Sequence, residues 1–163
     1  YPLVTGVQTC ALPILLRHRR LYDSCYVCVM RREHPLARPG ALTLDAYCAA
    51  HHLLVSFSGR PQGFVDQALM ALERQRRIVL TVNQFATAGR VVAGSDLLTV
   101  LPLSLLSATG MPSELAVRDL PFELNPVQVV MAWHRRQDGK PAHRWLRELI
   151  LSVPVPKQPA SPA

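Results

Sequence analysis

The cysteines are the residues whose spacing first suggests chemistry in this 163-residue chain. Cys25 and Cys28 are separated by two residues, which is the spacing of a redox or zinc motif. They belong to the run CYVCVMR, whose pattern predicts a strand, and residues three apart on a strand point to opposite faces. The other two cysteines, Cys10 and Cys48, do not form a second pair of this kind. The pattern therefore favours buried thiols over a metal or redox centre.

The histidines and short motifs do not form a catalytic or metal-binding pattern either. His51 and His52 are adjacent on a predicted strand, so their side chains diverge. His134 and His143 are separated by a loop and lack a partner at ligand spacing. The sequence contains no G-x-S-x-G elbow and no glycine-rich phosphate loop. We therefore expect no catalytic residue, no metal and no cofactor.

Hydroxyl, amide and aromatic side chains gather where two apolar strands are predicted to end. One group follows HLLVSF and the other follows RIVLTV, and each stands shortly before a predicted helix. In open α/β sheets, ligands bind outside the carboxyl ends of the strands, where helix N-termini present free N–H groups. The candidate ligand-binding residues are therefore Ser56, Ser58, Asn83, Phe85 and Thr87. The alternative is that Ser56 and Asn83 cap helices and that Phe85 belongs to the core.

The elements that must position these residues alternate along the chain. Apolar runs with Gly, Pro or Asn at their ends predict strands at residues 25–31, 52–57, 77–82, 97–101, 115–118 and 127–133. Amphipathic patterns predict helices at residues 44–50, 64–74, 85–92, 103–107 and 142–151. Strands that alternate with helices over short loops specify a mostly parallel sheet with helices on its faces, so the fold class is α/β.

Composition further limits which kinds of protein this chain can be. Hydrophobic residues make up 49% and charged residues 18%, which is typical of a globular chain, and no apolar run reaches the roughly 18 residues of a membrane helix. The net charge is +7, but the arginines are scattered rather than gathered in one patch, so we do not expect this chain alone to bind DNA. The lack of a disulfide framework favours a cytoplasmic location.

An ordered set of motifs resembles one family. CYVCVMRREHPLA, with its strand followed by HPLA, resembles the effector-binding domain of LysR-type transcriptional regulators. LTLDAYCAAHHLLVSFSG, GFVDQALMALERQRRIVLTV, FATAGRVVAGSDLLTVLP and LPFEL follow in the family's order. The closing MAWHRR and PAHRWLRELI are most similar to the nodulation-regulator-like branch. The resemblance covers the chain from about Leu21 to Ile150.

The resemblance implies a fold like the type 2 periplasmic binding proteins, with two α/β subdomains and a small-molecule effector in the cleft between them. Residues 21–124 would form the second subdomain, residues 125–150 would return to the first, and residues 151–163 would form a disordered tail. The family's DNA-binding domain, linker helix and first stretch of the first subdomain would be missing. The complete regulator would bind DNA through that missing N-terminal part and form a homo-oligomer.

Two other functions are compatible with an α/β fold of this kind. A solute-binding protein has the same fold but needs an export signal and both subdomains, and neither is visible in the sequence. A small α/β enzyme needs a convergent catalytic geometry, which a sequence does not show.

The uncharged segment VTGVQTCALPI, residues 4–14, fits none of these elements. A signal peptide carries its positive residues before the apolar run, whereas here Arg17 to Arg20 follow it. The segment resembles a one-frame translation of a sequencing-library adapter. We therefore expect residues 1–14 to be non-native and residues 15–20 to be a remnant of the preceding part of the gene.

Overall fold

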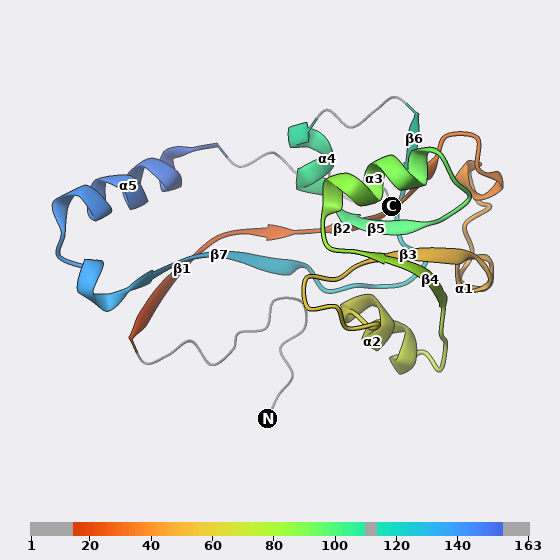
Figure 1. Cartoon of the computed structure of the whole chain (residues 1–163), viewed down its shortest axis with the longest axis horizontal. Helices are drawn as coiled ribbons and strands as arrows, with labels where there is room; N and C mark the ends of the chain where they lie inside the picture. The colour runs from red at the N-terminus through yellow and green to blue at the C-terminus, as the bar shows by residue number, and fades with distance from the viewer. Residues whose placement is uncertain (1–14, 110–113, 155–163) are drawn as a thin grey trace.

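A computed structural model describes residues 15–109 and 114–154 of the chain (Figure 1). Its strands are β1 (Leu16–Ser24), β2 (Tyr26–Arg31), β3 (His51–Val55), β4 (Arg77–Val82), β5 (Thr99–Pro102), β6 (Leu115–Arg118) and β7 (Val127–His134). Its α-helices are α1 (Leu44–Ala49), α2 (Phe64–Ala71), α3 (Phe85–Ala93), α4 (Leu103–Thr109) and α5 (Pro141–Ser152), with short 3₁₀ helices at η1 (Pro35–Ala37) and η2 (Arg135–Gln137). No helix in these ranges is long and apolar enough to cross a membrane.

Five strands form the body of the molecule. β2 lies between β5 and β6, β3 pairs with β4, and a bridge between His52 and Leu98 joins β3 to the start of the β5 segment. Two backbone hydrogen bonds secure this junction, from the Leu53 N–H to the Leu98 carbonyl (2.8 Å) and from the Leu98 N–H to the His51 carbonyl (2.9 Å). The strand order is therefore β4-β3-β5-β2-β6.

The sheet is mostly parallel, as predicted, with β2 as the exception. β3 and β4 are parallel and β3 meets the β5 segment in parallel, but β2 is antiparallel to both β5 and β6. The reason is the path of the chain, because β1 runs into β2 through the single residue Cys25. β2 therefore begins at the edge of the sheet where β5 ends, and it runs in the opposite direction to β5. Among the described residues, no helix precedes β2 to carry the chain back to the other edge, as α2 does before β4.

The body has apolar packing on both faces of the sheet. Side chains alternate along β2, so Cys28 and Met30 join one cluster whereas Val27 and Val29 join the other. The first cluster includes residues of α1 and α2 and the second includes residues of α3. Figure 1 shows these helices on opposite sides of the strands.

Local sequence signals explain where two of the helices begin and end. The Thr43 hydroxyl accepts a hydrogen bond from the Ala46 N–H (3.2 Å), so Thr43 caps the start of α1. The helix predicted over residues 64–74 ends earlier, at Ala71. Glu73 adopts a φ of 55°, the left-handed conformation that commonly ends a helix.

The strand β1 was not predicted. It pairs antiparallel with β7, so residues 15–20 lead directly into the same strand as residues 21–24. The resulting ribbon extends away from the body and leads to α5 (Figure 1). α5 continues to Ser152, so the tail predicted to be disordered from residue 151 is wrong for its first two residues. Residues 155–163 of that tail and the segment 1–14 lie outside the described residues. The division into subdomains at residues 21 and 125 stays a prediction.

A buried ion pair joins several elements of the body. The Arg76 Nε lies 2.8 Å from Asp66 Oδ1, and these side chains are 2% and 13% exposed. Arg76 also donates to Asp66 Oδ2 (3.1 Å) and to the Tyr47 hydroxyl (3.2 Å). The Gly63 N–H donates to Asp66 Oδ2 (2.7 Å) at the start of α2. One guanidinium therefore links α1, α2 and the approach to β4.

His52 is fully buried next to this pair. Its Nε2–H donates to the Tyr47 carbonyl (2.7 Å), whereas Nδ1 has no hydrogen-bond partner among the described residues. Burial lowers the pKa of His52 from 6.5 to about 4. The imidazole is therefore neutral in the folded protein at neutral pH.

We expect Asp66→Ala to lower the free energy of unfolding by about 3–5 kcal/mol, because it leaves the Arg76 guanidinium buried without its carboxylate. Urea denaturation followed by circular dichroism measures the change. Asp45→Ala is the matched control, since Asp45 pairs with Arg74 on the surface (3.0 Å), and it should cost at most about 1 kcal/mol. Equal losses in the two variants would contradict this account of Arg76.

His52 should make stability depend on pH. The unfolded imidazole binds a proton near pH 6.5 and the folded one near pH 4, so its contribution is fully present above pH 6.5 and is lost as the pH falls to about 4. The difference of about 2.5 in pKa corresponds to roughly 3 kcal/mol. Urea midpoints across this range should fall less steeply for His52→Gln than for the parent chain. Equal slopes for His52→Gln and the parent chain would contradict this account of His52.

Candidate functional site

The structure brings the two predicted ligand-binding segments together at one edge of the sheet. β3 and β4 are parallel, with Val55 opposite Val82, so both strands end at the same level. The Ser56 N–H donates to the Val82 carbonyl (2.8 Å), which fixes the two strand ends side by side. The loop after β3 leads to α2 and the loop after β4 leads to α3.

The candidate side chains at this edge are largely unused by the fold. Ser56 and Phe85 are half-buried, whereas Ser58, Asn83 and Thr87 are exposed. Thr87 Oγ1 donates to the Gln84 side-chain oxygen (3.5 Å). The side chains of the two serines and of Asn83 make no hydrogen bond to the described residues.

The structure does not support the alternative that Ser56 and Asn83 cap helices. The N-cap residue of α2 is Gly63 and that of α3 is Gln84, and neither makes a side-chain capping hydrogen bond. Phe85 is an intermediate case, because its ring borders the apolar cluster beneath α3 and is still half-buried. The polar candidates therefore remain available to a ligand.

Phe57 is a residue of this edge that the sequence analysis missed. Its side chain is 73% exposed and its ring meets the ring of Phe85 edge-on, with centroids 5.4 Å apart and planes at 80°. Gly59, two residues later, has a φ of +70°, a conformation that favours glycine. The sequence does contain a signal that could have identified Phe57. It is an aromatic residue between two serines at a strand end, where no core position is expected.

The β1–β7 ribbon leaves the body from this same edge. Tyr26 at the start of β2 pairs with Pro102 at the end of β5, and β5 runs in the direction of β3. The last residue of β1, Ser24, lies with its hydroxyl 3.4 Å from that of Ser104 in α4. A ligand at the edge would therefore lie on the side of the body that faces the ribbon.

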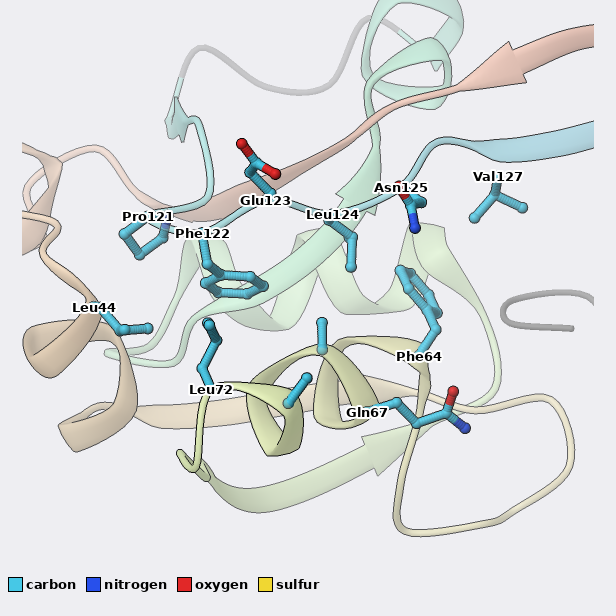
Figure 2. Close-up of a pocket in the computed structure, with 12 residues that line it drawn as sticks. Leu44, Phe64, Gln67, Leu72, Pro121, Phe122, Glu123, Leu124, Asn125 and Val127 are labelled. Carbon is cyan, nitrogen blue, oxygen red and sulfur yellow. The ribbon is translucent and has the colours of Figure 1, made fainter. Parts of the chain in front are cut away.

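A second concave feature lies between α2 and the segment 121–127. It is an open groove of about 610 Å³ (Figure 2). Two aromatic residues that line the groove pack against other rings of the body. Phe64 packs edge-on against Tyr26 and Phe122 against Tyr47, with ring centroids 4.7 Å and 5.4 Å apart. Figure 2 shows the Glu123 side chain pointing away from the groove. None of the five predicted ligand-binding residues lines it.

Cys28 and His34 occupy structural positions in the fold. Cys28 is fully buried in β2, and Cys25 lies just before that strand. Burial raises the pKa of the Cys28 thiol to about 12. Residues 15–109 and 114–154 contain no cluster of three His, Cys, Asp or Glu side chains that could hold a metal. His34 has a structural role, since its Nδ1 accepts a hydrogen bond from the Leu36 N–H (3.1 Å) at the start of η1.

Comparison with known proteins identifies the family. The family model described as the LysR substrate binding domain matches residues 5–154. The chain belongs to this family. The match begins at residue 5, inside the segment 4–14. That segment lies outside the described residues, and its proposed adapter origin stays a prediction.

The curated relatives are regulators of transcription. The HTH-type transcriptional activator NahR of Pseudomonas putida is 33% identical over 83% of this chain and 45% of its own length. The regulator SyrM of Rhizobium meliloti is 34% identical over 90% of this chain and 45% of its own length. Nodulation protein D 2 of Rhizobium tropici is 26% identical over 82% of this chain and 43% of its own length, which confirms the similarity to nodulation regulators. The chain spans about half the length of these relatives.

Solved structures confirm the fold. The regulatory domain of MexT from Pseudomonas aeruginosa superposes with a TM-score of 0.73 at 37% identity, over 85% of this chain and 66% of that domain. The effector binding domain of QuiR in complex with shikimate gives a TM-score of 0.69 over 90% of this chain and 68% of that domain. Its 14% identity shows the shared fold alone. The predicted architecture, like the type 2 periplasmic binding proteins, is thus confirmed.

We expect the native thiols to react with iodoacetamide in the order of their exposure. Cys25 and Cys48 are partly exposed, whereas Cys28 is fully buried and keeps its proton at neutral pH. Mass spectrometry of the labelled native chain should therefore find Cys28 unmodified, and labelling after denaturation should modify it. Rapid native labelling of Cys28 would contradict its position inside β2.

Proposed function

We propose that this chain is an effector-sensing part of a longer LysR-type transcriptional regulator and that a small molecule binds at the carboxyl edge of β3 and β4. The single observation that carries the proposal is the group of unused polar side chains where these parallel strands end. The residues we assign to effector binding are Ser56, Ser58, Asn83, Phe85 and Thr87, and we add Phe57.

The chemistry of this edge suits a small polar ligand with an apolar part. The serine hydroxyls and the Asn83 amide supply both hydrogen-bond donors and acceptors. The Phe57 and Phe85 rings supply an apolar surface beside them. The first turn of α3 begins at the same edge without a side-chain cap, so its N–H groups face the approach of a ligand.

The position of the edge suggests how binding would act on a regulator. The ribbon β1–β7 leaves from this side of the body, so a ligand that touches both would favour one relative orientation of the two. A ligand shifts a conformational equilibrium only by its difference in affinity for the two states. Contacts across this junction would supply that difference.

The other activities of the regulator would belong to parts of the longer protein outside this chain. DNA would be bound by another part of the longer protein, which would work as a homo-oligomer in the bacterial cytoplasm. The regulators found by comparison favour this function over a solute-binding protein or an enzyme.

We expect small carboxylic acids, with shikimate in the starting panel, to include a ligand that perturbs backbone amides of residues 56–59 and 83–87 in NMR spectra of the labelled chain. NMR is suited to this test because shifts report weak binding. Ser58→Ala should raise the dissociation constant roughly two- to tenfold, the effect of one hydrogen bond.

Ser152→Ala, an exposed serine on α5, is the matched control and should leave binding unchanged. Perturbations confined to the groove beside α2 would place the ligand elsewhere. Equal weakening in both serine variants would likewise rule out the assigned edge.

A further inference from the structure

Phe57 is the most exposed large apolar side chain among residues 15–109 and 114–154, at 73%. It belongs to neither of the two apolar clusters of the body. Its ring contacts the ring of Phe85, with centroids 5.4 Å apart. The hydroxyls on either side of it, those of Ser56 and Ser58, bond to none of the described residues. The fold therefore gains little from this ring, although it stands inside the proposed effector site.

The backbone around Phe57 fixes where the ring stands. The Ser56 N–H donates to the Val82 carbonyl (2.8 Å), which ties the residue before Phe57 to β4. Gly59 has a φ of +70°, and a Cβ there would meet no atom within 4 Å, so the turn and not crowding requires glycine. The partner ring, Phe85, packs against the apolar cluster beneath α3. The aromatic ring is thus presented to solvent by a turn with a defined path.

The two rings meet at 80°, so they form a corner. A third ring that stacks on Phe57 in an offset parallel arrangement lies nearly perpendicular to Phe85. Offset stacking and edge-to-face contact are the arrangements that aromatic rings favour, and each adds binding free energy beyond the burial of apolar surface. A saturated ring gains from burial only. The corner therefore distinguishes an aromatic ring from a saturated ring of similar size.

The other groups of the edge require polar atoms on the ligand and carry no formal charge. Residues 56–59 and 83–87 contain no Asp, Glu, Lys or Arg, and Arg60, the next residue after the first segment, is exposed. A wholly apolar occupant would bury the serine hydroxyls and the Asn83 amide without hydrogen bonds, which costs free energy. The chemistry therefore favours an occupant that has both an aromatic ring and hydrogen-bonding groups.

We propose that Phe57 determines the specificity of this edge by selecting small molecules in which an aromatic ring carries a carboxyl, hydroxyl or amide group. This role rests on the effector site proposed above and adds the chemical class of its ligand. Ser56, Ser58 and Asn83 bind the polar group, and the corner between Phe57 and Phe85 binds the ring.

Two probes separate aromatic selection from simple hydrophobicity. Benzoate and cyclohexanecarboxylate each carry one carboxylate on a six-membered ring, so Arg60 and the polar groups treat them alike. The cyclohexane ring exposes more apolar surface, so burial alone predicts that it binds at least as tightly. Selection by the aromatic corner predicts the reverse, with a dissociation constant roughly two- to tenfold lower for benzoate. NMR titration of the complete 163-residue chain measures both constants from the amides of residues 56–59 and 83–87.

Variants of Phe57 test whether its ring is the cause. Phe57→Leu keeps an apolar side chain and removes the ring, so the two constants should become equal. Phe57→Tyr keeps the ring and should keep the preference for benzoate. Trp145→Leu removes another exposed aromatic residue, 63% exposed on α5, and should leave the ratio unchanged. The ratio of the two constants is the readout, because a general loss of affinity or stability cancels from it.

The outcomes distinguish the role of Phe57 from the proposed function. Equal affinities at the edge, tighter binding of cyclohexanecarboxylate, a preference that survives in Phe57→Leu, or its equal loss in Trp145→Leu would overturn the role of Phe57 and leave the effector site in place. Shifts of the edge amides with shikimate but with neither probe would do the same. If no compound of the panel shifts these amides, both the effector site and the specificity assigned to Phe57 are wrong.

Discussion

The buried contact between Arg76 and Asp66 is the interaction on which the geometry of the body most depends. Asp66 binds the backbone at the start of α2, and Arg76 stands directly before β4 and also reaches the Tyr47 hydroxyl. The Tyr47 carbonyl in turn receives the hydrogen bond from His52 of β3. Both parallel strands are thus fixed at their beginnings, which sets where they end and where the candidate ligand-binding residues lie.

This arrangement separates the part of the body that fixes geometry from the part that is free to bind. The polar groups at the beginnings of β3 and β4 are buried and mostly paired, and a paired buried group resists displacement. At the carboxyl ends, the hydroxyls of Ser56 and Ser58 make no hydrogen bond to residues 15–109 or 114–154. A rigid base with an unused polar edge is what a binding site requires, because little of the binding free energy is then lost in ordering the protein.

The sequence was informative where local rules determine structure. The alternation of apolar runs and helical patterns predicted β2 to β7 and α1 to α5 closely, because each carries a local apolar pattern, even α5, of which no residue is buried. β1 carries no apolar alternation, since its ribbon is exposed and its pairing with β7 depends on a strand more than a hundred residues away. The direction of β2 and the Phe57–Phe85 contact were missed for the same reason, as each depends on the chain path rather than on local pattern.

The body differs from the β1–β7 ribbon and α5 in how much of each is buried. The body has apolar clusters on both faces of its sheet, whereas no residue of α5 is buried and β7 pairs only with β1 among the described strands. Elements with few buried contacts are the ones that rearrange at low free-energy cost. If the proposed effector site is correct, a bound ligand would lie where the ribbon leaves the body, and its contacts with both would favour one orientation of the ribbon.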